Sequence, residues 1–337
     1  MFIVENYAMA VVLCFITMMC WGSWGNTQKL AAKTWRYELF YWDYVIGMLL
    51  FSLLIGFTLG SIGSEGRHFI DDLSQASWAS IGSVLIGGVV FNASNILLSA
   101  SVSLAGMSVA FPLGVGIALV LGVIVNYIGE PKGSALLLSI GVAFVVAAII
   151  CNGVASGRVA KSKGESADTH RKGILLAGCA GVLMSFFYRF VAAAMDLDNF
   201  EHPAEGMFTP YGALFVFSVG VFLSNFVFTT WAMRRPFVGE PVSYREYFAG
   251  SAGTHMVGVL GGAIWCLGTA CSYIAAGKAG GAISYALGQG APMIAAIWGV
   301  FIWKEFKGAD RKTDLLLALM FILFIAGLSW IIAAGGN

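Results

Sequence analysis

Charged residues are scarce in this chain of 337 residues, where they make up 11% of the sequence while hydrophobic residues make up 58%. A soluble domain has about 25% charged and 45–50% apolar residues. No soluble fold of this length has enough interior to bury so much apolar surface, so a water-soluble protein is excluded. The formal net charge of +1 argues against nucleic acid as a partner. We therefore expect the solvent of this chain to be lipid.

Several signatures of enzymes are also missing. The sequence has no G-x-x-x-x-G-K-[ST] phosphate loop, no H-E-x-x-H zinc motif and no G-x-S-x-G nucleophile motif. We therefore expect neither an enzyme nor a bound cofactor. The six cysteines lie inside apolar segments without the spacing of metal ligands, so we interpret them as packing residues and predict no metal site.

Ten apolar segments are long enough to cross a bilayer, which takes about 20 mostly apolar residues of helix. They are predicted at 6–26, 38–60, 78–101, 106–128, 133–154, 173–195, 210–233, 249–275, 281–303 and 313–334. The first is interpreted as a retained helix because it lacks the basic flank of a signal peptide. The predicted fold class is therefore all-α, a polytopic membrane protein with ten transmembrane helices.

The basic residues sort the connections between these segments into two sides. One side holds only Arg67, Lys132 and Lys278. The other side holds nearly all the rest, namely Lys29, Lys33, Arg36, Arg158, Lys161, Lys163, Arg171, Lys172, Arg234, Arg235, Arg245, Lys304, Lys307, Arg311 and Lys312. The positive-inside rule places this second set in the cytoplasm. Both termini are then predicted to lie outside a cell (inner) membrane.

Two stretches 174 residues apart resemble each other. Gly87-Gly88 corresponds to Gly261-Gly262, Ala105-Gly106 to Ala279-Gly280, and Gly114-Val115-Gly116 to Gly288-Gln289-Gly290. Internal duplication in a very apolar chain is typical of membrane transporters that consist of two related halves.

The predicted organisation is an N-terminal five-helix repeat (1–155), a cytoplasmic linker (156–172) and a C-terminal five-helix repeat (173–337). Because five is odd, the second half enters the membrane from the opposite side, which makes the halves an inverted repeat. This arrangement predicts a binding site near the midplane between the halves, with alternating access to it.

Proline and glycine are expected to interrupt the fourth span at Phe111-Pro112-Leu113-Gly114 and the ninth at Gly288-Gln289-Gly290-Ala291-Pro292. Such breaks are tolerated in membranes where they are buried or line a cavity, and they indicate a transport site. The candidate substrate-binding residues near them are Asn92, Asn95, Phe111, Tyr285 and Gln289. The alternative for Asn95 and Gln289 is a hydrogen bond between helices.

Other candidates lie toward the ends of spans. Trp21, Trp24 and Asn26 would close the cavity from the cytoplasmic side, although the tryptophans also fit an interfacial belt. Arg189 in the sixth span is either a substrate or gating group, or it extends outward to the membrane surface. His255 either titrates near neutral pH or is simply packed.

Asp43 is the leading candidate for a proton carrier. The apolar part of the second span after it (45–60) is only about 24 Å of helix, so Asp43 is drawn toward the hydrocarbon, where a charge is costly. A carboxylate there would couple proton entry to transport. The alternative is an interfacial aspartate among the aromatic residues Tyr41, Trp42 and Tyr44.

Several motifs resemble the ureide permease family, within the drug/metabolite transporter superfamily. They are Gly22-Ser23-Trp24, Tyr41-Trp42-Asp43-Tyr44, Gly87-Gly88 leading to Asn95, Leu104-Ala105-Gly106-Met107-Ser108-Val109, Gln289-Gly290-Ala291-Pro292, Trp298-Gly299 and Lys304-Glu305-Phe306. The resemblance implies a proton-coupled importer of small polar heterocycles such as allantoin, uracil or xanthine. It also implies roles for Asp43, Asn95 and Gln289, which lie at positions resembling polar positions of the family.

Alternatives stay open at this point. The short basic linker departs from the long central loop of the plant members, and the Asn95 region also resembles the rhamnose and glucose/ribose porters. The substrate is thus a ureide or nucleobase, or else a monosaccharide. A multidrug exporter and a non-transport membrane receptor are further alternatives. The predicted partners are a small-molecule substrate, protons and the lipid bilayer, for a monomer or a homodimer.

Overall fold

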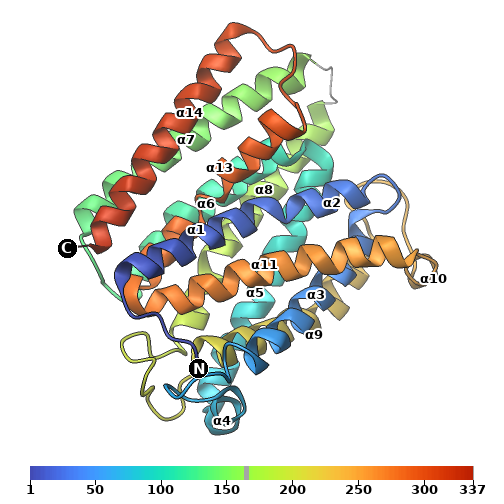
Figure 1. Cartoon of the computed structure of the whole chain (residues 1–337). Helices are drawn as coiled ribbons and strands as arrows, with labels where there is room; N and C mark the ends of the chain where they lie inside the picture. The colour runs from blue at the N-terminus through green and yellow to red at the C-terminus, as the bar shows by residue number, and fades with distance from the viewer. Residues whose placement is uncertain (163–166, 337) are drawn as a thin grey trace.

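The computed structural model describes residues 1–162 and 167–336, and it is helical almost throughout (Figure 1). Within those residues an isolated bridge between Met195 and Phe208 is the only strand-like pairing. The helices are α1 (Tyr7–Ser23), α2 (Gly25–Ala31), α3 (Tyr37–Phe57), α4 (Phe69–Gln75), α5 (Trp78–Ala105), α6 (Met107–Gly129), α7 (Ala135–Ser162), α8 (Ala167–Ala192), α9 (Pro210–Arg234), α10 (Tyr244–Phe248), α11 (Ala252–Ala279), α12 (Gly281–Gly288), α13 (Ala291–Ile297), the π-helix η1 (Trp298–Ile302) and α14 (Arg311–Gly335).

Ten segments of the described chain are long and apolar enough to cross a membrane, which confirms the predicted all-α membrane protein. The first combines α1 with α2, and the ninth combines α12, α13 and η1. Both ends of the chain lie at the end of the bundle opposite α10 (Figure 1). We name the end that carries α2, α10 and Lys307 the basic end, and the end that carries α4 and residues 196–205 the acidic end. The cytoplasmic location of the basic end stays a prediction.

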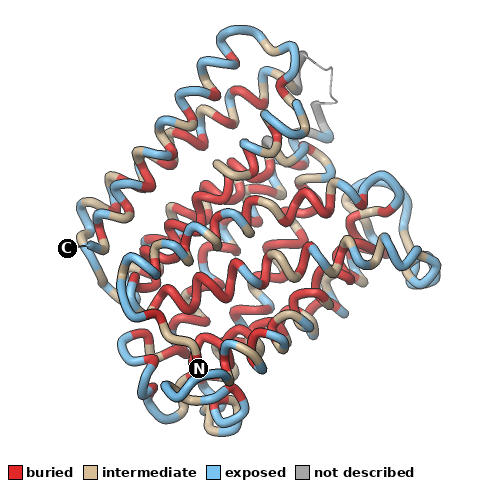
Figure 2. Tube along the Cα trace, in the orientation of Figure 1, coloured by how far each residue is buried: buried red, intermediate tan, exposed pale blue. Residues whose placement is uncertain are grey.

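The outer surface of the bundle is apolar. Along α14, Ile322 and Ile325 are 63% and 61% exposed, whereas Phe324 and Ile331 are buried against the bundle. Figure 2 shows this alternation of exposed and buried residues along α14. Apolar surface exposed to water costs about 25 cal/mol per Å², a cost that disappears when the surrounding solvent is lipid. The outward side chains therefore fit a membrane-embedded bundle.

Matched glycines set two of the closest contacts between the halves. A Cβ on Gly88 of α5 would overlap the Phe217 carbonyl oxygen of α9, and a Cβ on Gly262 of α11 would overlap the Tyr44 carbonyl oxygen of α3. Lipid supplies no hydrophobic drive between helices, so association depends on such close packing. The third span of each half thus crosses the second span of the other half. An inverted repeat would produce matched crossings of this kind, and the inverted repeat itself stays a prediction.

Both copies of the duplicated sequence turn at the same kind of glycine. Gly106 ends α5 with φ 79° and ψ 161°, and Gly280 ends α11 with φ 79° and ψ 155°. A positive φ strains residues with a Cβ, so glycine is the residue that fits there. Each junction places the next helix beside the one that it follows.

The predicted interruption of the fourth span is wrong. α6 continues through Pro112, which removes one backbone hydrogen bond in the second turn while the rest of the helix keeps its hydrogen bonds. The ninth span is interrupted as predicted. Gln289 and Gly290 both have ψ near 0° and separate α12 from α13.

The helices occupy most of the segment predicted as a linker (156–172). α7 continues to Ser162 and α8 begins at Ala167, while residues 163–166, including Lys163, lie outside the described residues. Residues 156–162 and 167–172 of the predicted linker are therefore helical.

A buried carboxylate holds the acidic end together. Asp72 of α4 accepts hydrogen bonds from the Thr209 amide at 3.1 and 3.0 Å and from the Thr209 hydroxyl at 2.9 Å. Arg67 lies 3.2 Å from the same carboxylate. Burial nevertheless raises the pKa of Asp72 from 3.8 to about 6, against the opposing effect of these partners.

This pKa shift predicts a pH-dependent stability. Because the folded pKa lies above the unfolded value, the stabilisation is fully present below about pH 4 and is lost as the pH rises through about 6. We expect the melting temperature of the wild type in detergent to decrease as the pH is raised from 4 to 7. The melting temperature of Asp72→Asn should decrease less over the same range, because this variant has no carboxyl group to titrate at that position.

The matched control is Asp71→Asn, on the same helix but exposed. This variant should keep the pH dependence of the wild type. Identical pH profiles for Asp72→Asn and the wild type would refute the assignment.

Candidate functional site

A small cavity lies between mid-length positions of spans from both halves. Its volume of ≈ 30 Å³ holds about one or two water molecules. The lining comes from α1, α5, α6, α8, α11 and the break between α12 and α13. The lining residues are Trp21, Trp24, Phe91, Asn95, Leu98, Phe111, Val115, Met184, Phe187, Trp265, Gln289 and Ala291. Of the residues predicted from sequence, Trp21, Trp24, Asn95, Phe111 and Gln289 are thus brought together. We name this space the central cavity.

Half of the lining residues are aromatic. Trp21 and Trp265 stack with ring centroids 5.9 Å apart and an interplanar angle of 11°. Phe91 packs on Trp265 at 4.3 Å, and Trp24 lies 6.1 Å from Phe111. Flat aromatic faces of this kind suit a planar or ring-shaped ligand.

Two buried amides supply the polarity of the central cavity. Asn95 of α5 is 1% exposed and donates a hydrogen bond to the Tyr41 hydroxyl at 3.2 Å. Gln289 is 2% exposed and lies in the break of the ninth span, where its amide contacts the Tyr285 hydroxyl. A primary amide carries both donors and an acceptor. The cavity can therefore satisfy a ligand that has both kinds of group on one edge.

Two predicted ligand residues face neighbouring helices. Tyr285 is fully buried behind the central cavity and donates to the carbonyls of Ala118 and Met184, at 3.1 and 3.3 Å. The Asn92 amide donates to Val221 and Ser224 of α9, at 3.1 and 2.9 Å. Both side chains therefore join helices in this conformation.

Arg189 and Asn26 lie at opposite ends of the bundle. Arg189 packs against Gly129 at the end of α6, beside Glu130. Asn26 accepts a hydrogen bond from the Trp303 indole at 2.6 Å at the basic end. Neither side chain lines the central cavity.

Sequence reasoning missed Phe91, Met184, Phe187 and Trp265. The duplication held a usable signal for two of them, because Phe91 and Trp265 occupy equivalent positions 174 residues apart. Their rings meet across the interface between α5 and α11. Met184 and Phe187 lie on α8 without a distinguishing motif.

Ion pairing closes the cavity toward the basic end. Lys29 of α2 forms an ion pair with Glu305, which follows the ninth span. The Lys29 ammonium also lies 4.5 Å from the centre of the Trp303 ring, a cation–π contact. Together with the hydrogen bond between Asn26 and Trp303, these contacts join the first span to the ninth. We name the pair Lys29–Glu305 the basic-end latch.

A hydroxyl network closes the cavity toward the acidic end. Tyr188 of α8 donates to the Ser272 carbonyl at 3.3 Å, and Ser284 of α12 donates to the same carbonyl at 2.8 Å. These groups are fully buried. They join α8, α11 and α12 in a layer that separates the central cavity from the acidic end.

Asp43 lies outside the central cavity in a cluster with His255 and Tyr247. The His255 Nδ1 atom lies 2.9 and 3.0 Å from the two carboxylate oxygens, and the Tyr247 hydroxyl donates to Oδ1 at 2.6 Å. Trp35 covers the imidazole edge-on at 4.6 Å. Asp43 is 3% exposed, whereas the His255 side chain is 26% exposed at the basic end. The buried Asp43 carboxylate is thus connected to the surface of the basic end through the partly exposed His255.

Residues 1–162 and 167–336 contain no candidate metal site, because no three histidine, cysteine, aspartate or glutamate side chains lie close enough together to hold a metal ion.

Comparison with known protein families gives a match over most of the chain. The family model described as ureide permease matches residues 40–172 and 158–334. The chain belongs to the ureide permease family. It is 25% identical to ureide permease 2 of Arabidopsis thaliana over 399 residues and 23% identical to ureide permease 1 of the same plant over 393 residues. Each alignment covers 100% of this chain and 100% of the relative. The resemblance in the sequence motifs is thereby confirmed at the level of the family.

A solved crystal structure shares the fold of this ureide permease family member. It superposes with a TM-score of 0.60 at 15% sequence identity and covers 96% of each chain.

The basic-end latch predicts a charge-exchange effect. Lys29→Glu and Glu305→Lys each place like charges at the latch, so we expect each to lower substrate uptake by about fivefold or more. The double exchange restores the attraction and should return uptake to within about twofold of the wild type.

Lys33→Glu, an exposed charge reversal one turn further along the chain, serves as the control and should leave uptake unchanged. A double exchange no more active than the single variants would show that the pair is not a functional unit.

Proposed function

We propose that this chain imports a small, neutral ureide or nucleobase-like heterocycle across the cell membrane, in symport with protons and by alternating access. The observation that carries the proposal is the central cavity, where two amides lie among stacked aromatic rings between the two halves. The names of the relatives add that proteins of this family are ureide permeases.

The lining of the central cavity matches the chemistry of a ureide. A ureide or nucleobase presents adjacent carbonyl and N–H groups on a flat ring, and the amides of Asn95 and Gln289 can pair with both. The lining contains no charged side chain, so it favours a neutral solute over an anion. It equally disfavours a multidrug exporter of cations, which would find no carboxylate there.

The volume of the cavity supports a closed intermediate of alternating access. Ligand sites are usually about 300–1,000 Å³, far above the ≈ 30 Å³ of this cavity. A ureide therefore enters only if the helices around the cavity separate. The basic-end latch on one side and the Tyr188 layer on the other are the contacts that must break alternately.

Equivalent acid–base pairs at the two ends also support this mechanism. Glu305 ends the ninth span and pairs with Lys29, whereas its counterpart Glu130 ends the fourth span and lies beside Arg189 without an ion pair between them. The Glu130 Oε1 atom is buried and has no hydrogen-bond partner. The ion pair between Lys29 and Glu305 is thus formed in this conformation, whereas Glu130 and Arg189 are neighbours that would pair in another conformation. Arg189 is accordingly proposed as a gating residue.

Asp43 is the proposed proton carrier. Its contacts with His255 and Tyr247 place it where a proton can leave toward the basic end, the predicted cytoplasmic side. Tyr41 and Tyr44 flank it on α3, and Tyr41 accepts the hydrogen bond of Asn95. This short connection along α3 is the proposed link between proton release and the substrate site.

The proposal is tested by uptake into proteoliposomes of labelled allantoin, uracil, xanthine, ribose, glucose and rhamnose, with and without an inward proton gradient. We expect saturable uptake of the ureide or nucleobases, accelerated by the gradient, and a KM raised about tenfold by Asn95→Ala. The loss of about 1.4 kcal/mol of hydrogen bonding corresponds to that factor.

The control is Asn126→Ala, because Asn126 is equally buried but donates within α6 to the Gly122 carbonyl. Sugar uptake without ureide uptake would favour the monosaccharide symporter. Uptake that ignores the gradient would rule out proton coupling.

Asp43→Asn isolates the coupling step. The variant keeps the shape of the side chain but cannot carry a proton, so we expect gradient-driven accumulation to disappear while exchange of internal for external substrate persists. Glu38→Gln, a buried carboxyl group on the same helix that pairs with Arg36, should retain accumulation. Unchanged accumulation in Asp43→Asn would assign Asp43 a purely structural role.

A further inference from the structure

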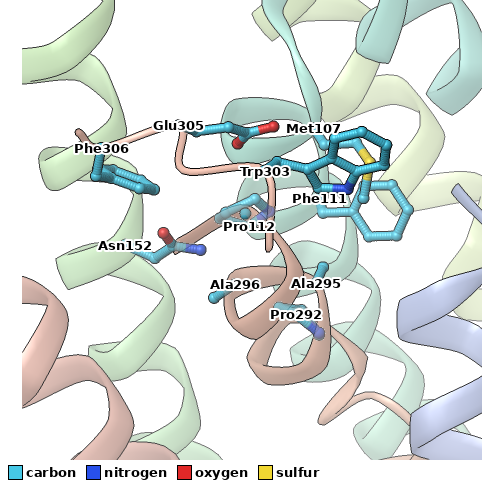
Figure 3. A pocket seen from close by; sticks show the side chains of 11 residues that line it. Met107, Phe111, Pro112, Asn152, Pro292, Ala295, Ala296, Trp303, Glu305 and Phe306 are labelled. Carbon is cyan, nitrogen blue, oxygen red and sulfur yellow. The ribbon is translucent and has the colours of Figure 1, made fainter. Parts of the chain in front are cut away.

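A second cavity lies between the central cavity and the basic end, bordered by α6, α7 and α13 (Figure 3). Phe111 lines both cavities, so the two spaces adjoin at this residue. The volume of the second cavity is ≈ 10 Å³ in this closed state, about the space of one water molecule. Figure 3 shows Asn152 of α7 on one side of this cavity, with Trp303 and Glu305 at its rim.

Asn152 is a buried polar side chain that borders the second cavity. It is 3% exposed, and its amide borders the second cavity without a hydrogen bond to another described residue. A buried amide that leaves its hydrogen bonds unmade costs about 1–3 kcal/mol, and the adjoining cavity has room for only about one water molecule to offset that cost. The side chain lines the second cavity. An amide kept in such a position indicates a ligand that visits it.

Glu305 adds a second polar group to the rim. Its carboxylate is held by Lys29 in the basic-end latch while it also lines the second cavity. A carboxylate accepts N–H groups as readily from a ligand as from a lysine. A ligand with an N–H donor would therefore compete with Lys29 for Glu305.

We propose that Asn152 and Glu305 form an exit-side subsite for the urea-type edge of the transported heterocycle. The proposal rests on the function proposed above. Asn152 pairs with the adjacent carbonyl and N–H groups of the substrate, while Glu305 accepts a second N–H group. Arrival of the substrate thus draws Glu305 from Lys29 and releases the basic-end latch. The Phe111 ring would separate this subsite from the central cavity.

The test compares the two faces of the transporter. Proteoliposomes sorted by orientation report the KM for labelled ureide presented at the basic end or at the acidic end. Asn152→Leu preserves the approximate volume and removes the unpaired amide, so the protein should remain as thermally stable as the wild type or become more stable. We expect its KM at the basic end to rise about tenfold, the factor for about 1.4 kcal/mol of lost hydrogen bonding, with less than a twofold change at the acidic end.

Two further variants make the outcome decisive. Asn126→Leu, at a buried asparagine away from both cavities, should leave both KM values unchanged, and Asn95→Ala should raise both. An Asn152→Leu protein with unchanged KM values, or with equal rises at both faces, would overturn the subsite. Absence of ureide uptake by the wild type would instead overturn the proposed function, so the two failures are distinguishable.

Discussion

Close crossing of helices at Gly88 and Gly262 is the constraint on which the rest of the structure depends. A side chain at either glycine would overlap the backbone of the crossing helix, so the second and third spans of opposite halves would separate. Both crossings are needed to hold α5 and α11 in position, where Phe91 and Trp265 meet. The walls of the central cavity follow from these contacts. Lipid supplies no hydrophobic drive for helix association, so close packing between the helix backbones has to supply the attraction.

A second constraint explains where the chain departs from regular helix. Backbone groups in the hydrocarbon core must find partners within the protein. The break at Gln289 and Gly290 meets this requirement because both residues are buried between other helices. It also places the Gln289 side chain in the lining of the central cavity, which Asn95 lines as well. The break in the ninth span thus lies beside the central cavity, where its polar groups could contact a polar solute.

The sequence predicted the architecture better than the orientation of individual side chains. Length and hydropathy determine the spans, so all ten were identified. The repeat and the helix break point to Asn95 and Gln289, and both line the central cavity. Asn92 and Tyr285 were also expected at the site, yet they contact α9 and backbone carbonyls, because the rotation of a helix with apolar residues all round cannot be read from its composition.

Partners distant in sequence escaped prediction for the same reason. Tyr247 of α10 and His255 of α11 reach Asp43 because both helices pack beside α3. Asn152 appeared to be an ordinary residue of the fifth span until the fold placed it beside the ninth. Such contacts depend on how helices pack, which no local pattern encodes.

The central claim is that the cavity between the halves binds the substrate. A structure determined experimentally with a bound ureide or uracil tests this claim most directly. The account predicts ligand density between the amides of Asn95 and Gln289, with its ring against Trp21 or Trp265 and the surrounding helices moved apart to admit it. Density at another site, with this cavity still closed, would contradict the account.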